Sequence, residues 1–285
     1  MKLYSFKFPS TDPVRIGVGK QGGLVDVTDA VGTNDMVRLI EDFDALRPRI
    51  LDALDAAASV FSFADVRLQA PLRPGKILCC GINYHGHFTE NPGAKMPQKP
   101  FFFPKFPSNV VGPGQPILHP RGVEQLDWEV EFTVVFGKKA RSLPENKSVM
   151  DTVFGYTILH DVSARDVQFV DAQITLGKNF ETFAPVGPCL VTKDELPDLS
   201  DVKLRTLLNG QLVQNGSTAD WIYSLPHLIS WLTSVMTMYP GDLMTTGTPA
   251  GVGYFSQPQH FMKAGDRIRL EIEGIGVLEN PIVAE

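Results

Sequence analysis

Leu126-Asp-Trp-Glu-Val-Glu-Phe-Thr-Val-Val-Phe136 carries the residue pattern on which the fold prediction depends. Within it, the apolar residues Trp128 and Val130 alternate with Glu129 and Glu131, which is the two-residue period of a β-strand. The two carboxylates therefore share one face of the predicted strand. Like charges on one face repel unless solvent, a basic partner or a cation offsets them. The pair indicates either the wet side of a surface strand or part of a cation site.

A third carboxylate favours the cation site. Residues 154–160 form another apolar strand pattern, and Asp161 stands at its end. Three carboxylates offer oxygen alone, which suits Mg²⁺ or Mn²⁺ better than zinc, and such ions usually keep positions open for water or substrate. We therefore hypothesise that Glu129, Glu131 and Asp161 bind a divalent cation, with Mg²⁺ as the first choice and Mn²⁺ or Ca²⁺ as alternatives.

The rest of the second part of the chain is also rich in strand patterns, broken by frequent Pro and Gly. The predicted strands are residues 76–82, 129–136, 152–159, 202–208 and 267–272, and the best helical patterns are residues 163–171 and 223–236. Strands do not alternate regularly with helices, which disfavours a doubly wound parallel sheet. We predict a fold that is mainly β with some α, in the α+β class.

The first seventy residues look like a separate small α+β unit. Strand-like pieces at residues 2–8, 14–18 and 24–28 precede a helical pattern at residues 35–58, where Pro48 predicts a break between two short helices. Residues 70–75, Ala-Pro-Leu-Arg-Pro-Gly, have the composition of a connector. We therefore place a small N-terminal domain at residues 1–70 and a catalytic domain at residues 71–285.

Charge and composition narrow the class of function. The 285 residues carry a formal net charge of −6, and the basic residues are scattered instead of clustered, unlike those of a nucleic-acid binder. No apolar run approaches a membrane span or a signal-peptide core. The three cysteines lack the spacing of a zinc site or a disulfide framework. We expect no nucleic-acid or membrane partner and a cytoplasmic location, or the mitochondrial matrix if the source is eukaryotic.

His87 and Glu90 are candidates for a catalytic pair. They stand three residues apart, which places them on one face if the segment is helical. A histidine oriented by a carboxylate is a suitable general base. A surface pair is the more frequent meaning of this spacing, and His85 is a second candidate for the base.

Two further segments carry residues that suit an anionic substrate. Lys178 is a single cation among aromatic and turn residues, so it lies at the surface unless it turns toward the carboxylates, where it stabilises negative charge on a substrate oxygen. Residues 245–253 lack the Gly-Lys-Ser/Thr ending of a phosphate loop. This segment either offers backbone amides and the Thr248 hydroxyl to a carboxylate or is only a tight turn.

The order of these motifs resembles that of the fumarylacetoacetate hydrolase superfamily, from about residue 76 to the C-terminus. The spacing is most similar to that of the fumarylacetoacetate hydrolase domain-containing proteins and acylpyruvases. The segments that carry the resemblance are Gly81-x-Asn-Tyr-x-x-His87-x-x-Glu90, Lys99-Pro to Lys105-x-Pro-Ser108 with Gly112-Pro-Gly114, Asp127-Trp-Glu-x-Glu131, His160-Asp-Val-Ser-Ala-Arg-Asp166, Gly177-Lys-x-Phe and Thr246-Gly-Thr-Pro-x-Gly-Val-Gly253. The resemblance implies a mixed β-sandwich roll with a small N-terminal domain, usually found as a homodimer.

The resemblance also assigns roles to individual residues. It implies that the metal ligands are Glu129, Glu131 and Asp161, that the water-activating dyad on a lid is His87 with Glu90, and that the catalytic lysine is Lys178. It implies a substrate site that includes Tyr84, Arg165, Gln168, Gly247 and Thr248. An ion pair with a nearby acid such as Asp166 explains Arg165 equally well. The long fumarylacetoacetases use a further aspartate ligand where this chain has Cys79-Cys80-Gly81, so we expect three protein ligands.

The implied reaction is metal-dependent hydrolysis of a carbon–carbon bond in a 2,4-dioxo acid of the acylpyruvate type, through a metal-bound enolate. The same enolate without an attacking water gives oxaloacetate decarboxylation, and proton transfer alone gives oxaloacetate keto–enol tautomerisation. A non-enzymatic alternative is a protein that binds a small 2-oxo acid and has lost turnover. All of these stay open at the level of the sequence.

Overall fold

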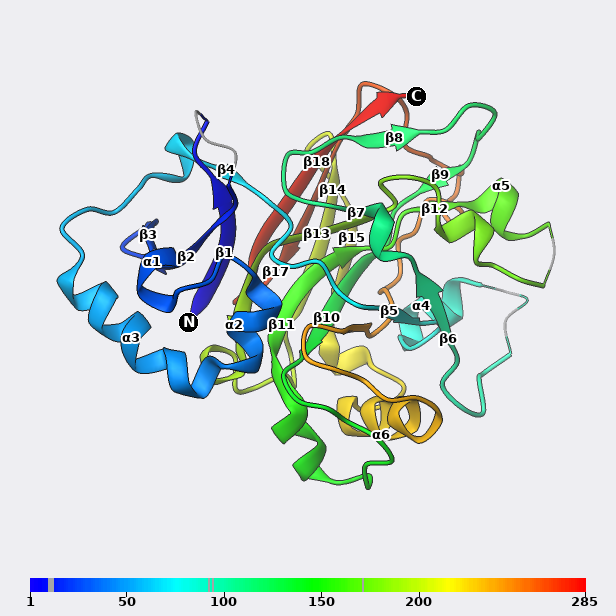
Figure 1. Cartoon of the computed structure of the whole chain (residues 1–285). Coiled ribbons are helices and arrows are strands. Elements are labelled where there is room, and N and C mark those ends of the chain that lie inside the picture. The colour runs from blue at the N-terminus through cyan, green and yellow to red at the C-terminus, as the bar shows by residue number, and fades with distance from the viewer. Residues whose placement is uncertain (10–12, 92, 94, 171) are drawn as a thin grey trace.

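A large mixed β-sheet runs through the protein, whose computed structural model describes residues 1–9, 13–91, 93, 95–170 and 172–285 (Figure 1). Within these residues the sheet has eleven strands. Its main path is β3 (Gly23–Asp26), β2 (Arg15–Lys20), β1 (Lys2–Lys7), β13 (Ala184–Thr192), β11 (Val153–His160), β10 (Val130–Phe136), β16 (Leu243–Thr245), β5 (Ile77–Cys80) and β6 (Phe102–Lys105). Off this path, β4 (Arg67–Leu68) pairs with β1, and β7 (Val110–Val111) pairs with β13.

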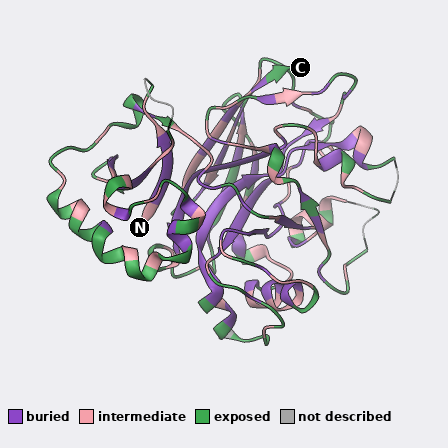
Figure 2. Cartoon of the chain, in the orientation of Figure 1, coloured by how far each residue is buried: buried purple, intermediate pink, exposed green. Residues whose placement is uncertain are grey.

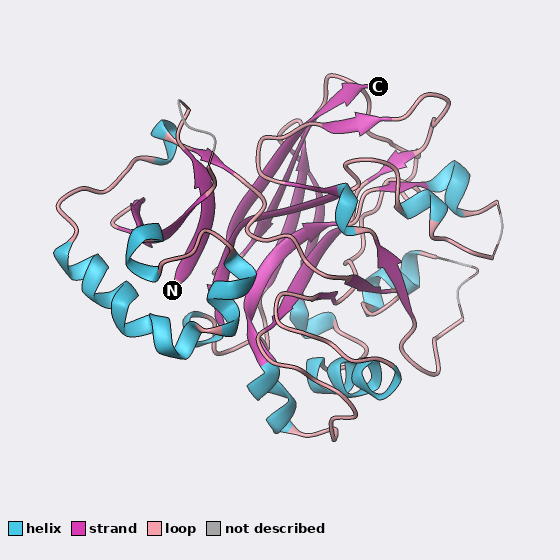
Figure 3. Ribbon diagram, viewed as in Figure 1, coloured by secondary structure: helices cyan, strands magenta, loops and turns pink. Residues whose placement is uncertain are grey.

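A second sheet packs against the first (Figure 3). In the described chain it has five strands, in the order β15 (Gln211–Ser217), β14 (Lys203–Leu208), β17 (Arg267–Ile272), β18 (Gly276–Ala284) and β8 (Ile117–His119). One hydrophobic cluster joins Phe132 and Ile158 of the large sheet to Leu204 and Leu270 of the smaller one. β9 (Leu126–Asp127) and β12 (Ser163–Ala164) form a short separate ribbon. The predicted α+β fold, mainly β with some α, is confirmed.

Helices are short and lie around the sheets (Figure 3). The α-helices of the described residues are α1 (Thr28–Val31), α2 (Met36–Glu41), α3 (Phe43–Ala56), α4 (His85–Glu90), α5 (Arg165–Gln168) and α6 (Leu225–Val235). The 3-10 helices are η1 (Phe63–Asp65), η2 (Pro107–Asn109), η3 (Lys147–Thr152), η4 (Leu176–Lys178), η5 (Lys193–Glu195) and η6 (Thr218–Asp220). None of the helices described here combines the length and the hydrophobicity that crossing a membrane needs.

The strand β10, which follows the Asp-Trp-Glu segment, lies near the centre of the large sheet and is buried along its whole length (Figure 2). One of its faces carries Val130 and Phe132 into the core between the two sheets. The opposite face carries Glu131 and Val135, and Val135 packs in a second core. The predicted alternation is therefore present, but both faces are covered. The carboxylate of Glu131 points into the protein interior and not into solvent.

The strand predictions hold for the second part of the chain, where β5, β10, β11, β14 and β17 lie within one residue of the predicted bounds or inside them. The helix predicted at residues 223–236 is α6, with Ser224 as its N-cap and Pro226 in its first turn, where a proline is tolerated. Of the helix predicted at residues 163–171, only α5 is helical among the described residues. Asp171 lies outside the described residues.

The predicted helix break at Pro48 is wrong. Pro48 lies inside α3, and the break between α2 and α3 falls at Asp42 instead. A proline inside a helix removes one backbone hydrogen bond, here the one to the carbonyl of Asp44. Both residues are on the exposed side of α3, so water can hydrate that carbonyl. The helix therefore continues through the proline.

The N-terminal strands extend the large sheet. β1 pairs with β13 in antiparallel register, with Leu3 opposite Leu190. Leu3, Leu39 and Leu190 belong to one hydrophobic cluster that also contains Phe154 of β11. Residues 1–70 thus share a sheet and a core with residues beyond 70, and the domain boundary placed there stays a prediction.

Replacing Leu3 by Ala should lower the free energy of unfolding by about 2–5 kcal/mol, because Leu3 is fully buried in this shared core. The matched control is Leu51→Ala in α3, where the leucine is 44% exposed and the change should stay within about 0.5 kcal/mol. Chemical denaturation measures both. Equal, small effects of the two substitutions would show that the N-terminal strands do not depend on the shared core.

Candidate metal centre and active site

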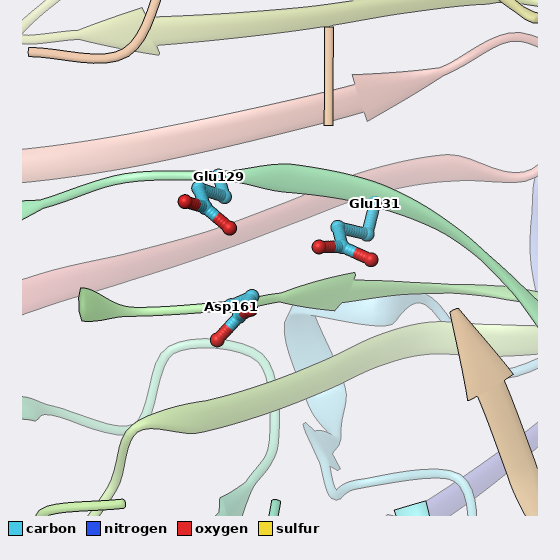
Figure 4. Close-up of side chains that lie close together, drawn as sticks. All are labelled: Glu129, Glu131 and Asp161. Atoms are coloured by element: carbon cyan, nitrogen blue, oxygen red, sulfur yellow. The ribbon is translucent and has the colours of Figure 1, made fainter. Parts of the chain in front are cut away.

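Antiparallel pairing brings the three predicted ligands together. β10 and β11 run in opposite directions, with Val130 opposite His160, so the start of β10 meets the end of β11. Glu129 immediately precedes β10 and Asp161 immediately follows β11, and the Asp161 amide donates to the Glu129 carbonyl at 3.0 Å. One carboxylate oxygen from each of Glu129, Glu131 and Asp161 lies within 4.8 Å of the others (Figure 4). Two carboxylates from one strand segment and a third from thirty or more positions further along the chain thus form one acidic cluster.

All three carboxylates are buried, at 5%, 1% and 0% exposure for Glu129, Glu131 and Asp161. This arrangement excludes the surface strand that the sequence left open. Charged groups removed from water need partners, because their desolvation is expensive. The surrounding side chains show which of the three carboxylates have such partners.

Lys178 is one of the partners. It lies on η4, and its Nζ is 2.8 Å from Glu129 Oε2 and 2.9 Å from Asp161 Oδ2. Its side chain is 3% exposed, so it is not the surface lysine of the default interpretation. Burial opposes the charge, but Asp161 and Glu129 outweigh it and raise the pKa of Lys178 above its usual value. Lys178 is therefore a fixed ammonium group beside the cluster.

Arg165 is the second partner. Its Nε donates to Asp127 Oδ2 at 2.8 Å, and its Nη2 forms an ion pair with Glu129 Oε1 at 2.7 Å. Its Nη1 donates to the Gln168 side-chain oxygen at 3.0 Å. Arg165 therefore does form ion pairs, as the alternative interpretation of the sequence predicted, but its partners are Asp127 and Glu129. Asp166 instead accepts a hydrogen bond from the backbone amide of residue 124.

Lys105 is a third buried cation, and the sequence analysis assigned it no role. Its Nζ donates to Asp161 Oδ1 at 2.5 Å, to the Lys178 carbonyl at 2.6 Å and to the Val162 carbonyl at 3.1 Å. Lys105 stands in one of the segments that carry the family resemblance, but a single lysine at the end of a strand gives no local signal of burial. Only the tertiary contact with Asp161 reveals it.

Asp127 was missed for a similar reason. Besides Arg165, it accepts hydrogen bonds from the amides of Trp128, Gly253 and Tyr254 at 2.7–3.0 Å. It connects the start of the acidic strand segment to the turn at residues 251–254. In the sequence it looks like an ordinary polar residue before a strand.

The pKa values of two carboxylates in the acidic cluster are shifted in opposite directions. Burial raises the pKa of Glu129, but Lys178 and Arg165 outweigh it and hold that pKa below its usual value. Burial, followed by the charges of Asp161 and Glu129, raises the pKa of Glu131 well above its usual value. Among the described residues no lysine or arginine forms an ion pair with Glu131. Glu131 is therefore the carboxylate that lacks a compensating charge.

A count of charges shows how well a cation fits. The buried acids of this network, Asp127, Glu129, Glu131 and Asp161, carry four negative charges when ionised, and its buried cations, Lys105, Arg165 and Lys178, carry three positive ones. His160 adds none, because burial, followed by the charge of Lys105, lowers its pKa to about 3. One negative charge is left over. An oxygen-only donor set with an uncompensated carboxylate fits Mg²⁺ or Mn²⁺.

The His87–Glu90 pair forms on α4. His87 Nδ1 is 2.6 Å from Glu90 Oε1, and Glu90 Oε2 accepts a hydrogen bond from the Gly251 amide at 2.7 Å. The Gly86 amide donates to Asp220 at 2.8 Å, which holds the start of the helix. His85 is exposed. The structure therefore orients His87, and not His85, by a carboxylate.

Most of the predicted site residues line a cavity of about 200 Å³, whose polar lining includes His87, Glu129, Glu131, Arg165, Lys178 and Thr248. Gln168 also lines it, and several phenylalanines, among them Phe101 and Phe255, form the apolar part of its wall. Glu90 and Asp161 are not lining residues but contact His87 and Lys178, which are. The cavity thus places a histidine, a lysine and a hydroxyl around the acidic cluster.

Two predicted substrate residues lie outside this lining. The Gly247 amide donates to Glu131 Oε2 at 3.0 Å, and its φ of +83° is a backbone conformation that favours glycine. A Cβ at this position would lie 2.8 Å from the Gly81 carbonyl oxygen. Tyr84 is fully buried and forms a β-bridge with Trp221. Gly247 thus supports a carboxylate, and Tyr84 is buried without being one of the cavity's lining residues.

The fold and the site together define a class: a sheet-dominated enzyme with a buried cluster of three carboxylates that could hold a cation, beside a lysine and a His–Glu pair. Comparisons with known proteins identify the family within that class. The family model of the fumarylacetoacetate hydrolase C-terminal domain matches residues 76–283. The chain belongs to the fumarylacetoacetate hydrolase family, whose members are enzymes that act on carbon–carbon bonds.

Relatives match over the whole chain. A protein of Xenopus laevis named oxaloacetate tautomerase fahd2, mitochondrial, is 40% identical over 99% of this chain and 90% of its own length. The structure of a fumarylacetoacetate hydrolase from Exiguobacterium antarcticum is 36% identical, with a TM-score of 0.86 and full coverage of both chains. A maleylpyruvate hydrolase from Sphingobium sp. SYK-6, solved with manganese(II) and pyruvate, is 32% identical with a TM-score of 0.84, over 100% of this chain and 99% of that one. The similarity therefore includes residues 1–75.

Replacing Glu131 by Gln should abolish Mn²⁺ and Mg²⁺ binding together with turnover, because the change removes a charged oxygen ligand at constant volume. Isothermal titration of metal-free protein with Mn²⁺ measures the first effect without any assay of activity. The matched control is Glu41→Gln on the exposed side of α2, which should bind Mn²⁺ like the wild type. Wild-type Mn²⁺ affinity in the Glu131 variant would contradict the proposed centre.

The pH dependence of stability should report the same carboxylate. A folded-state pKa of Glu131 above the ordinary value of 4.5 contributes stability that is complete below that value and is lost as the pH rises through the raised pKa. In thermal melts, metal-free wild type should therefore lose more stability with rising pH than the Glu131→Gln variant, and Mn²⁺ should reduce the loss. Parallel pH profiles of the two metal-free proteins would show that Glu131 is not destabilised by its neighbours.

Proposed function

We propose that this protein interconverts the keto and enol forms of oxaloacetate, with a divalent cation bound by Glu129, Glu131 and Asp161. The observation that carries this proposal is the relative named an oxaloacetate tautomerase, which matches 99% of the chain at 40% identity. That match supports tautomerisation over acylpyruvate hydrolysis, which was the main prediction from sequence. It supports catalysis over a keto-acid-binding protein without turnover.

His87 is the proposed base. Tautomerisation of a 2-oxo acid moves one proton: C3 loses it, a carbon–carbon double bond forms, and the 2-oxo oxygen gains a proton. The Nδ1 atom of His87 is engaged by Glu90, which leaves Nε2 to take the proton from C3. The Glu90 carboxylate stabilises the imidazolium that results, and the Gly251 amide holds the carboxylate in place. The imidazolium then gives its proton to the 2-oxo oxygen, which completes the enol, and the same steps in reverse regenerate the keto form.

Lys178 is the proposed stabiliser of negative charge on the substrate oxygen. It lines the cavity, and its ammonium is held between Glu129 and Asp161 in a dry environment. A fixed positive charge costs no reorganisation when the oxygen becomes negative. A divalent cation on the three carboxylates would act there as a Lewis acid toward the 2-oxo group.

Hydrolysis of a dioxo acid is the second candidate, and one observation favours it. The structural relative named maleylpyruvate hydrolase was solved with manganese(II) and pyruvate and shares the fold of the whole chain. The His87–Glu90 pair can direct a water at a carbonyl carbon as well as accept a proton from carbon. Decarboxylation of oxaloacetate requires the same cavity. Product analysis separates the three reactions.

Three further parts of the sequence prediction remain proposals. Mg²⁺ is proposed as the physiological ion, and the manganese in the Sphingobium relative supports Mn²⁺ as its alternative. The homodimer stays a prediction. The relative from Xenopus laevis is named mitochondrial, which supports the mitochondrial matrix over the cytoplasm as the compartment.

With Mg²⁺ or Mn²⁺, the purified protein should speed the loss of the ultraviolet absorbance of enol-oxaloacetate without releasing pyruvate. Replacing His87 by Gln should lower this rate by about 10²–10⁴-fold, because it removes the base, and should leave Mn²⁺ affinity unchanged. The matched control is His85→Gln, on the same helix but exposed, which should keep the wild-type rate. Pyruvate release from acylpyruvates or oxaloacetate at a higher rate than enol conversion would overturn the assignment as a tautomerase.

A further inference from the structure

A buried amide joins the two sheets directly behind the site. Gln214 lies on β15 and is 2% exposed. Its Nε2 donates to Thr248 Oγ1 and to the Pro249 carbonyl, both at 2.9 Å. Its Oε1 accepts from the Val130 amide at 3.1 Å and from Thr206 Oγ1 at 2.8 Å. All four hydrogen-bonding positions of the amide are therefore occupied.

The network permits one orientation of this amide. The Val130 amide can only donate, so the Gln214 oxygen must face it. The Pro249 carbonyl can only accept, so the Gln214 nitrogen must face that side. A flipped side chain would set a donor against a donor and an acceptor against an acceptor. The buried position makes such mismatches expensive.

The fixed amide determines what the Thr248 hydroxyl does. The Gln214 nitrogen has only protons to offer, so Thr248 Oγ1 must be the acceptor in their hydrogen bond. The hydroxyl proton then has to point elsewhere, and no acceptor for it is found among the described residues. Thr248 lines the cavity. Its proton is thus available to an acceptor atom of a molecule bound there.

Close packing holds this hydroxyl in place. A Cβ on Gly216 of β15 would lie 2.3 Å from the Pro249 side chain, and a Cβ on Gly251 would lie 2.2 Å from the Val213 carbonyl oxygen. The turn of residues 247–251 therefore rests directly on β15 at two points. Gln214 and the turn behave as one rigid unit.

We propose that Gln214 is a positioning residue that makes Thr248 an obligatory hydrogen-bond donor to an anionic oxygen of the bound 2-oxo acid. This inference rests on the proposed function only in that a small oxyanion enters the cavity. Thr248 touches the ligand, and Gln214 acts through Thr248. A hydroxyl free to rotate would offer the ligand its proton in only part of its orientations, and binding would weaken.

The test measures oxalate binding to the Mn²⁺-loaded protein by calorimetry, with four single variants and one double variant. Thr248→Val should weaken oxalate binding by about tenfold or more, because one hydrogen bond to a charged group is lost. Thr248→Ser keeps the hydroxyl and should bind oxalate about as tightly as the wild type. Gln214→Leu should weaken binding by about threefold to tenfold. In the Thr248→Val background, Gln214→Leu should add less than about twofold, since its partner is already gone. Additive losses, or unchanged binding in Gln214→Leu, would overturn the proposal.

Thr206→Val provides the matched control. It removes the other hydroxyl bound to the same amide but leaves the donation to Thr248 intact. Oxalate affinity should therefore stay at the wild-type value, although thermal stability falls. Gln214→Leu also removes the acceptor of the Val130 amide, which is next to the metal ligands. Mn²⁺ affinity is therefore measured for every variant. Unchanged Mn²⁺ affinity in Gln214→Leu shows that the ligands are undisturbed. If Gln214→Leu does not fold, Gln214→Met takes its place with the same expected pattern.

Oxalate does not turn over, so the result is independent of the reaction assay. Coupling between Gln214 and Thr248 in a protein that does not tautomerise oxaloacetate would uphold this inference and reject the proposed reaction. A protein that tautomerises oxaloacetate but shows additive losses would uphold the proposed reaction and reject this inference. Failure of the Mn²⁺-loaded wild type to bind oxalate would overturn the inference outright.

Discussion

Repulsion among carboxylates in a dry interior is the constraint on which the site depends. Antiparallel pairing of β10 and β11 brings Glu129, Glu131 and Asp161 together at 5% exposure or less, where bulk solvent screens their charges poorly. Lys105, Arg165 and Lys178 compensate most of the charge, and each of them also ties down a segment that carries another site residue. The cations therefore fix geometry as well as charge. Because Glu131 has no such partner, the cluster can accept one more positive ion.

Patterns within single segments predicted a large part of this structure. The alternation in residues 126–136 identified the strand and the shared face of Glu129 and Glu131, because side-chain direction in a strand follows directly from position. The helical pattern of residues 223–236 identified α6 in the same way. Asp161 was found because strand ends are visible as the ends of apolar runs. These signals are local, so a single sequence carries them.

Contacts between distant segments escaped prediction. Lys105 meets Asp161 across fifty-six positions, and Gln214 meets Val130 across eighty-four. Nothing in the composition around Lys105 or Gln214 distinguishes them from solvated surface residues. Pro48 is an error of the opposite kind. The proline predicted a helix break, but α3 continues through it, because the carbonyl that loses its hydrogen bond is exposed to water. The burial of a polar residue is a property of the assembled fold, and neighbouring residues do not determine it.

The turn of residues 247–251 serves three parts of the site at once. Its first amide supports Glu131, its hydroxyl faces the cavity, and its last amide holds the carboxylate that orients His87. An insertion or deletion there would disturb the cation, the ligand and the base together. Divergence of substrate preference among descendants of this fold should therefore accumulate in the apolar part of the lining, where phenylalanine side chains such as those of Phe101 and Phe255 have no polar atoms whose loss would break a hydrogen bond. The turn is constrained because three parts of the site depend on it, whereas the apolar lining can change more freely during evolution.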